Sequence, residues 1–238
     1  MRVTWVSRAG GRGINSDAVR KLSLGGITCV AAADGLGGGN AGAAASKTAA
    51  DAVMEAFKAS PELSAEALRG YITYAHEKVF RYSASDPEYV GMSSTAAVLL
   101  VKGRRAVWAN VGDSRIYRFR RGRIAEVTED NSLAFRAFMD GAIEYNDIRS
   151  SAERNKLTDA LGAYIKDLAV SDIRVTDSET DFLVCTDGLW EYVTENKMEE
   201  LYRASRNPRE WLEKMLSERE ARAGEDGDCF TAAVVSMS

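Results

Sequence analysis

One stretch near the N-terminus, residues 27–46, constrains the fold more than any other part of the sequence. It begins with the apolar run Ile27–Ala33, whose length is typical of a buried strand. The run stops at Asp34 and passes through glycines into an alanine-rich segment, beginning at Asn40, that is typical of a helix. This pattern predicts a carboxylate held on a rigid element, with open backbone around it.

Two interpretations of this stretch compete. Residues 37–42 fit the pattern G-x-G-x-x-G between a strand and a helix, which is typical of dinucleotide binding. That fold needs a second parallel strand ending in an acid about 20 residues further on. The sequence instead predicts helices over 46–58 and 63–82, with no strand between them. The other interpretation makes Asp34 an oxygen ligand for a divalent cation.

A second apolar run with the same ending lies far along the chain. Residues 181–186 form this run, and Asp187 is followed by Gly and Leu, as Asp34 is. Each acid alone fits an ordinary turn, but the pair predicts that two carboxylates converge on one metal site. Asp228 is a third turn acid that leads into a predicted strand.

The residue types that could act as ligands indicate which metals the site would bind. The single histidine, His76, falls in the second predicted helix, where a structural or solvated role is expected, and the spacings of zinc-binding His and Cys pairs are absent. The ligands would be carboxylates, which favour Mg²⁺, Mn²⁺ or Ca²⁺ over zinc.

The bulk properties exclude several classes of protein. A formal net charge of −4 argues against a nucleic-acid-binding protein. No run approaches the roughly 18 apolar residues of a membrane span, and the first residues lack the apolar core of a signal peptide. The three cysteines are odd in number and lie in or beside apolar runs, so a reduced, cytoplasmic setting is expected.

The remaining segments predict a two-sheet architecture. Four short strands separated by glycine turns, between residues 95 and 128, predict an antiparallel meander. Further strands are expected over 2–7, 18–24, 168–176 and 230–237, and further helices over about 195–205 and 208–222. Residues 132–156 are polar and predict a small flap. One domain, 1–238, with two sheets between helices fits this order.

The order of short motifs resembles that of a known family. The motifs are Arg12-x-x-Asn15-x-Asp17, Asp34-Gly35-x-Gly37-Gly38, Ser94-Thr95, Asn110-Val111-Gly112-Asp113-Ser114-Arg115, Thr128-x-Asp130-x-Ser132, Leu157-Thr158-x-Ala160-Leu161-Gly162, Thr186-Asp187-Gly188-Leu189-Trp190 and Asp228-x-x-Thr231. Together they are similar to the metal-dependent protein phosphatases, the type 2C serine/threonine phosphatases, in their compact bacterial form. The similarity runs over almost the whole chain.

The resemblance implies an α+β fold, a four-layer α-β-β-α sandwich of two mainly antiparallel sheets flanked by helix pairs. It also implies a site for two Mn²⁺ or Mg²⁺ ions, with a possible third ion near Asp113. The matching metal ligands are Asp17, Asp34, Gly35, Asp113, Asp187 and Asp228. Asp34 matches the carboxylate that bridges both ions, and Gly35 contributes its carbonyl oxygen. Arg12 matches the arginine that binds the substrate phosphate.

Physical chemistry supports the same assignment. Two divalent cations about 3.5–4 Å apart lower the pKa of a shared water and stabilise displacement at phosphorus. Clustered carboxylates are tolerable when cations neutralise them. The planar fork of an arginine such as Arg12 donates two hydrogen bonds to a phosphate.

Three positions depart from the family pattern. Ser16 stands where Glu or Gln is usual, which predicts weaker binding of the second ion. Leu36 replaces a histidine that many eukaryotic members carry, which we interpret as a mark of lineage. Cys229 replaces the usual Asn and would lie beside a ligand, where it could be sensitive to oxidation.

The expected function is metal-dependent hydrolysis of phosphoserine and phosphothreonine in proteins, opposing a serine/threonine kinase, by a monomeric cytoplasmic enzyme. Two alternatives remain open at this point. One is a phosphatase for a small phosphorylated metabolite, since the site chemistry would be the same. The other is a catalytically weakened metal-binding signalling module of the same fold, which Ser16 and Cys229 motivate.

Overall fold

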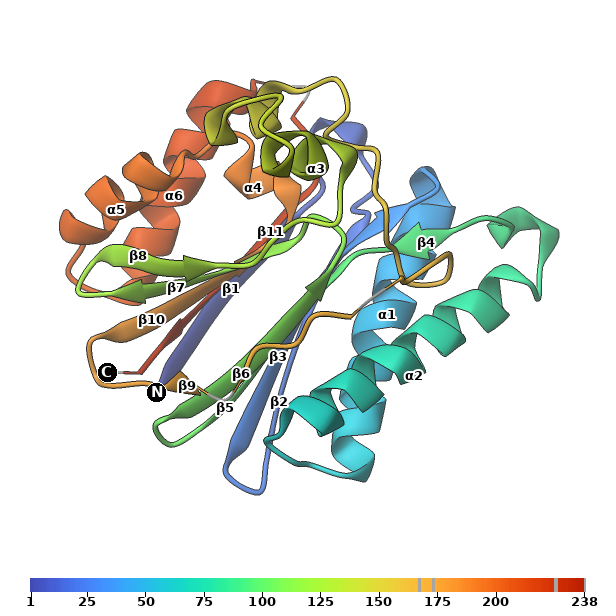
Figure 1. Cartoon of the computed structure of the whole chain (residues 1–238), viewed down its shortest axis with the longest axis horizontal. Coiled ribbons are helices and arrows are strands. Elements are labelled where there is room, and N and C mark those ends of the chain that lie inside the picture. The colour runs from blue at the N-terminus through green and yellow to red at the C-terminus, as the bar shows by residue number, and fades with distance from the viewer. Residues whose placement is uncertain (167, 173, 225–226, 238) are drawn as a thin grey trace.

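Two antiparallel sheets lie face to face between two layers of helices (Figure 1). The computed structural model describes residues 1–166, 168–172, 174–224 and 227–237, without the side chains of residues 12 and 175. The two sheets between two layers of helices confirm the predicted α+β sandwich of four layers, α-β-β-α.

The first sheet has the order β1 (Arg2–Arg8), β11 (Phe230–Ser236), β10 (Thr180–Cys185), β7 (Arg115–Arg120) and β8 (Arg123–Val127). The second has the order β2 (Asp17–Leu24), β3 (Ile27–Leu36), β5 (Ala96–Lys102), β6 (Arg105–Val111) and β9 (Arg174–Val175), and the short β4 (Ser93–Ser94) pairs with the end of β3. Helices α1 (Gly39–Ala59) and α2 (Ala65–Ser83) cover the second sheet, and α4 (Asp187–Trp190), α5 (Glu195–Arg203) and α6 (Pro208–Ala223) pack on the first.

Three buried apolar clusters separate the four layers. One lies between α1, α2 and the second sheet, one between the two sheets, and one between the first sheet and α4–α6. Alternation along each strand explains this division, because successive side chains point to opposite faces. On β10, Phe182 and Val184 face the other sheet, whereas Leu183 and Cys185 face the helices. Both faces of the central strands β3, β5 and β11 are covered, so their sequences are almost continuously apolar.

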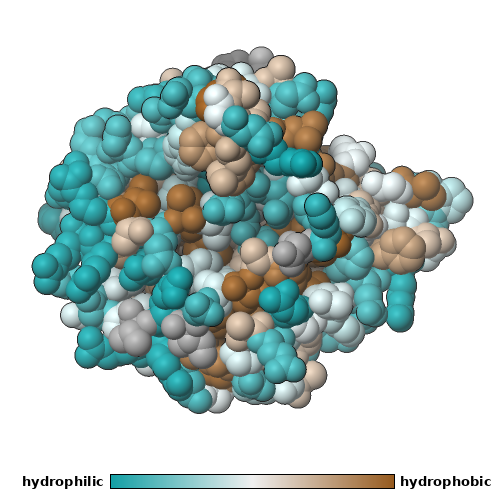
Figure 2. All heavy atoms as spheres, viewed as in Figure 1, coloured by the Kyte–Doolittle hydropathy of each residue, from teal (hydrophilic) through white to brown (hydrophobic). Residues whose placement is uncertain are grey.

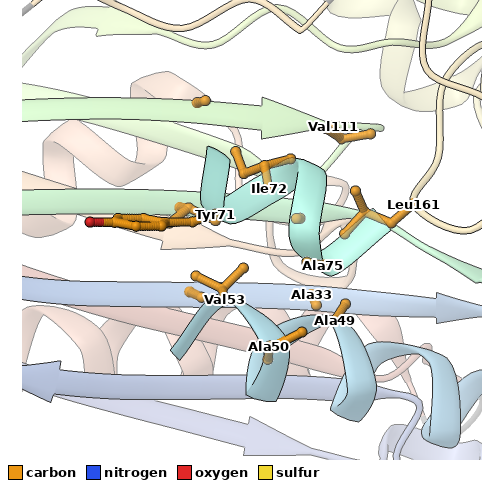
Figure 3. Packing of buried hydrophobic residues seen from close by; sticks show 14 of the residues in the cluster. Ala33, Ala49, Ala50, Val53, Tyr71, Ile72, Ala75, Val111 and Leu161 are labelled. Carbon is orange, nitrogen blue, oxygen red and sulfur yellow. The ribbon is translucent and has the colours of Figure 1, made fainter. Parts of the chain in front are cut away.

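Small side chains allow α1 to approach β3 closely. Ala31 and Ala33 of β3 belong to the same buried cluster as Ala49 of α1. Figure 3 shows the side chains of α1 and α2 gathered over the strands, including Val53 from α1 and Ile72 from α2. The alanine-rich sequence thus predicts the helix and also explains its position directly on the strand that ends in Asp34.

The predicted meander is wrong in one respect. Strands β5 and β6 pair in the second sheet, whereas β7 and β8 pair in the first. The chain changes sheets in the turn at Gly112–Ser114, where Gly112 has a φ of 86° that disfavours any other residue. Regular strand spacing does not reveal such a change, because each hairpin looks the same in sequence.

Other elements differ in extent from the predictions. The strand expected over 168–176 reduces, among the described residues, to the short β9 and an isolated bridge between Ala109 and Val170. Strand β3 continues two residues beyond Asp34, because β4 supplies a pairing partner. Residues 132–156, where a flap was predicted, contain helix α3 (Leu133–Met139) and a 3-10 helix, η3 (Tyr145–Ser150). Two further 3-10 helices are η1 (Gly10–Arg12) and η2 (Pro87–Tyr89).

The surface over α5 and α6 is mostly hydrophilic (Figure 2). Ion pairs with a spacing of four residues follow the exposed side of α6, such as Arg209 with Glu213 and Arg222 with Glu218. In the described part of the chain, none of the helices combines the length and the apolar character needed to cross a membrane.

Candidate metal centre

An acidic cavity of about 200 Å³ lies at one end of the sandwich. Asp34 and Gly35 reach it from β3, Asp113 from the turn between the sheets, Asp187 from the start of α4, and Asp228 from the segment before β11. The remaining lining residues are Ile14, Ser16, Leu36, Gly37, Gly38, Gly39, Asn155 and Leu157. Five of the six predicted metal ligands therefore meet at one cavity, although they lie far apart in the sequence.

Asp17, the sixth predicted ligand, does not line the cavity but is adjacent to a residue that does. It pairs with Asp34 across β2 and β3, and its side chain interacts with that of Asp34. Its Oδ2 accepts a hydrogen bond of 2.6 Å from the Thr186 hydroxyl. Its Oδ1 is buried and has no hydrogen-bond partner. An unsatisfied buried carboxylate oxygen is costly unless a ligand or ion completes its contacts.

The backbones that carry the acids are fixed by hydrogen bonds. The Asp34 N–H donates to the Thr95 hydroxyl at 2.9 Å, and the Ser94 hydroxyl donates to the Asp34 carbonyl at 2.9 Å. On the other side of the cavity, the indole N–H of Trp190 donates to the Asp113 carbonyl at 2.9 Å. Local order of this kind holds a set of ligands in place before any ion binds.

Gly35 is fixed by close contact with α1. A Cβ at this position would lie 1.7 Å from the Gly42 carbonyl oxygen, so a larger residue would push the helix away from the strand. The Gly35 N–H donates to the Ser16 carbonyl at 3.0 Å. The glycines that fit a dinucleotide motif in the sequence thus allow β3, α1 and the Ser16 segment to pack together beside the cavity.

Burial, and after it the charge of neighbouring acids, raises the pKa values of four of these acids. Burial, followed by repulsion from Asp187, raises the pKa of Asp34 well above its usual range, and burial with repulsion from Asp113 does the same for Asp187. Burial raises the pKa of Asp113 to about 7 and that of Asp17 to about 6. These groups would ionise far more readily beside cations, which supply the missing opposite charge.

This donor set fits divalent cations that prefer oxygen. It consists of carboxylates and a backbone carbonyl at Gly35, and it includes the unsatisfied oxygen of Asp17. As the side chains stand, no three His, Cys, Asp or Glu residues in the described ranges approach closely enough to enclose an ion. The acids line the cavity as separate side chains.

Several residues that support the site were not assigned a role from the sequence. Thr186 accepts the Thr231 N–H at 2.9 Å while it donates to Asp17, so it joins β10, β11 and β2. The hydroxyls of Thr95 and Ser114 lie 2.6 Å apart beside Asp34. Their only sequence signal was membership in the short motifs. Asn155, at the end of the predicted flap, lines the cavity.

Two of the departures from the family pattern are in contact. The Ser16 N–H donates to Cys229 Sγ at 3.4 Å, and the thiol itself lies within hydrogen-bond distance of the Ile14 carbonyl, at 3.3 Å. The thiol is buried, so it packs the loop that carries Ser16. The sequence alone gives no sign of the contact between Ser16 and Cys229, because the two residues lie near opposite ends of the chain.

The structure describes the side chain of His76 but not that of Arg12, the two other residues considered from the sequence. His76 lies on α2, and its Nδ1 accepts a hydrogen bond of 3.2 Å from the Gly162 N–H, so it has the structural role, one of the two that were expected. The backbone of Arg12 ends η1, but its side chain lies outside the described part of the structure. Its role toward phosphate stays a prediction.

Comparisons with known proteins agree with this architecture. The sequence profile of a family described as Protein phosphatase 2C matches residues 9–223. The serine/threonine phosphatase stp of Listeria welshimeri is 32% identical over 205 residues, which cover 83% of this chain and 80% of that protein.

Solved structures are similar over nearly the whole chain. The serine/threonine phosphatase Stp1 of Staphylococcus aureus has a TM-score of 0.86 at 25% identity and covers 98% of this chain and 94% of its own. The catalytic domain of the phosphatase PstP, in complex with two manganese ions, has a TM-score of 0.84 at 22% identity and covers 99% of this chain and 97% of its own.

Proposed function

Because the chain belongs to the protein phosphatase 2C family, we propose that it hydrolyses phosphoserine and phosphothreonine in proteins and opposes a serine/threonine kinase. The observation that carries this proposal is the meeting of four aspartates, Asp34, Asp113, Asp187 and Asp228, at one cavity. The raised pKa values of three of them indicate that opposite charge is missing there. A cavity of this kind is suited to metal-assisted hydrolysis of a phosphate ester.

Each acid has a proposed part in holding two Mn²⁺ or Mg²⁺ ions. Asp34 would hold both ions, Asp187 and Asp228 would hold the first, Asp17 would hold the second, and the Gly35 carbonyl would hold one of the two. When bound, the ions would lower the pKa of a water and offset charge on the phosphoryl group. Thr186 would keep Asp17 in place through its 2.6 Å hydrogen bond. Asp113 would serve a third ion.

Arg12 is proposed to bind the substrate phosphate. Loss of its guanidinium in Arg12→Ala should raise KM, and kcat should also fall if the group aligns the transition state. Half-saturation by manganese should stay the same, because arginine coordinates no cation. Arg8→Ala, at the end of β1, removes an exposed arginine that pairs with Glu220 and serves as the control. Unchanged KM and kcat in Arg12→Ala would assign Arg12 to the solvated surface.

The organisation of the protein is also part of the proposal. Residues 1–238 would form one phosphatase domain. Residues 132–156 would form a flap beside the acidic cavity, because Asn155 of this segment lines that cavity. We further propose that the protein acts as a monomer in the cytoplasm, where phosphorylated proteins are its substrates.

A turnover assay tests the function directly. The purified protein is given a phosphothreonine peptide with manganese, with and without a chelator, and in parallel free phosphothreonine at the same concentration. We expect rapid release of phosphate from the peptide, slower release from the free amino acid, and none with the chelator. Inactivity with every divalent metal would favour an inert metal-binding module. Faster turnover of the free amino acid would favour a metabolite phosphatase.

A further inference from the structure

A second cavity, which the proposed function does not use, lies at the opposite end of the first sheet. It has a volume of about 150 Å³ and is lined by Ser178, Asp181, Tyr202, Ser205, Arg206, Asn207, Pro208, Trp211 and Ser236. We refer to it as the Asp181 cavity. β10 begins beside it and ends just before Asp187, while β11 runs from just after Asp228 to Ser236 (Figure 1). The two cavities therefore lie at opposite ends of the same two strands.

Asp181 is the unusual residue in this cavity. It is 6% exposed and lies on the face of β10 that packs against α5 and α6, since side chains alternate along the strand. Its Oδ2 accepts a hydrogen bond from the Tyr202 hydroxyl. Its Oδ1 is buried and has no hydrogen-bond partner. A buried carboxylate with one bare oxygen is unfavourable for folding unless something else binds there.

Two of the neighbouring donors are already in use. The Ser205 hydroxyl donates to the Leu201 carbonyl at 2.7 Å, and the indole N–H of Trp211 donates to the Met198 carbonyl at 3.1 Å. Arg206 is the one basic side chain among the described lining residues. It is 88% exposed, and its guanidinium pairs with Glu210 at 3.0 Å, so it does not neutralise Asp181.

Two aromatic side chains line the cavity beside Asp181. The rings of Tyr202 and Trp211 meet edge to face, with centroids 4.9 Å apart, and Phe119 stacks on Tyr202. Aromatic faces attract cations through their quadrupole, and they also accommodate a short alkyl chain. Burial raises the pKa of the Tyr202 hydroxyl, which therefore stays protonated and keeps donating to Asp181.

We propose that the Asp181 cavity binds a primary ammonium group on a short alkyl chain. The ammonium would lie beside the Asp181 carboxylate, whose closed-off Oδ1 would have to turn toward the cavity to accept its hydrogen bond. The alkyl chain would lie against Tyr202 and Trp211. A cavity of about 150 Å³ holds a ligand of roughly the size of benzene, which matches butylammonium or the end of a lysine side chain. The ligand is thus a small free amine or a lysine of another protein, and these two sources share the same chemistry.

Titrations followed by NMR test the proposal on the whole protein. Butylammonium and 1-butanol, a neutral analogue of the same length, are added separately to ¹⁵N-labelled protein, and the indole N–H signals of Trp211 and Trp190 are recorded. We expect butylammonium to shift Trp211 saturably and to leave Trp190, beside the acidic cavity, unchanged. Butanol should bind at least about tenfold more weakly, because a hydrogen bond between charged groups is lost. Equal binding of both compounds, or no saturable shift, would overturn the proposal.

Variants locate the site. Asp181→Asn keeps the size of the side chain and should weaken butylammonium binding at least about tenfold. Glu179→Gln removes the same charge from an exposed neighbour and should leave binding unchanged. Full binding by Asp181→Asn would contradict the assignment. The comparison of the two compounds on the wild-type protein remains decisive if that variant does not fold.

A last titration identifies the source of the ammonium group. A glycine pentapeptide with a central lysine is compared with butylammonium on the wild-type protein. Equal affinity assigns the cavity to a lysine side chain of a partner, and binding of butylammonium alone assigns it to a small free amine.

Discussion

Two clusters of buried and half-buried charged side chains lie beside the turn that joins the two sheets, and they are built in opposite ways. The first, the carboxylate cluster, contains Asp17, Asp34, Asp113, Asp187 and Asp228, and the strongest neighbouring charges on Asp34 are other acids. The second, the arginine cluster, contains Arg115, Asp130, Arg149 and Glu195, and it pairs each acid with an arginine. Asp113 and Arg115 are only two residues apart in the sequence.

The arginine cluster is complete without any ligand. Arg115 is 2% exposed and forms a two-pronged hydrogen bond with Asp130, at 2.8 and 2.7 Å. Its guanidinium also lies 3.6 Å from the centre of the Trp190 ring. Trp190 in turn donates to the Asp113 carbonyl, so the arginine cluster positions one residue of the carboxylate cluster.

The comparison shows that buried acids have different roles in the arginine cluster and in the carboxylate cluster. A buried acid that already has an arginine partner serves the fold, and removal of the partner leaves an uncompensated charge. A buried acid whose neighbours are also acids is incomplete by itself, and a cation completes it. Removal of a charge should therefore have opposite consequences for stability in the two clusters.

The largest effect is expected for Arg115→Met. This change should lower the free energy of unfolding by about 3–5 kcal/mol, because Asp130 would remain buried without its partner. Arg118→Met on the same strand is the control: its pair with Glu126 is partly exposed, so the loss should stay within about 1 kcal/mol. Urea unfolding followed by circular dichroism measures both. Similar losses in the two variants would remove the distinction between the clusters.

The second effect concerns Asp34→Asn and Asp187→Asn. Turnover should fall by more than about a hundredfold, since even residues that only orient metal ligands contribute 10- to 100-fold. The metal-free variants should be as stable as the wild type or more stable, because one source of repulsion is gone. Phosphopeptide turnover at limiting manganese and thermal unfolding with chelator measure these quantities. A variant with wild-type turnover would show that its residue does not coordinate an ion.

The third effect is the stabilisation of the wild-type protein by manganese. At a concentration of about 100 times Kd, binding should add about 2.7 kcal/mol to the free energy of unfolding. Asp187→Asn should lose most of this gain, whereas Arg118→Met should keep it. Thermal unfolding over a series of manganese concentrations gives the gain for each protein. An equal gain in Asp187→Asn would place the binding site elsewhere.

Much of the fold followed from local patterns in the sequence. The apolar run before Asp34, the alanines after it and the second Asp-Gly-Leu ending correctly predicted a strand, a helix and the meeting of Asp34 with Asp187. These predictions succeeded because a residue at the end of a buried strand has few possible positions. The change of sheet at Gly112 and the contact between Ser16 and Cys229 were not predictable, because they depend on how distant segments pack.

The smallest expected effect is that of Ser16→Glu, which adds a sixth acid to the carboxylate cluster. Ser16 lines the acidic cavity and is 9% exposed, so a longer side chain at this position can extend into the cavity. A hydroxyl brings no negative charge to offset the dehydration of a cation, whereas a carboxylate does. The manganese concentration for half-maximal turnover should therefore fall by about three- to tenfold, which corresponds to roughly 0.7–1.4 kcal/mol, with little change in KM for the peptide. Ser16→Gln has the same size without the charge and separates the electrostatic effect from the steric one. An unchanged or higher manganese requirement in Ser16→Glu, or an equal gain in Ser16→Gln, would show that water and Asp17 already satisfy the second ion.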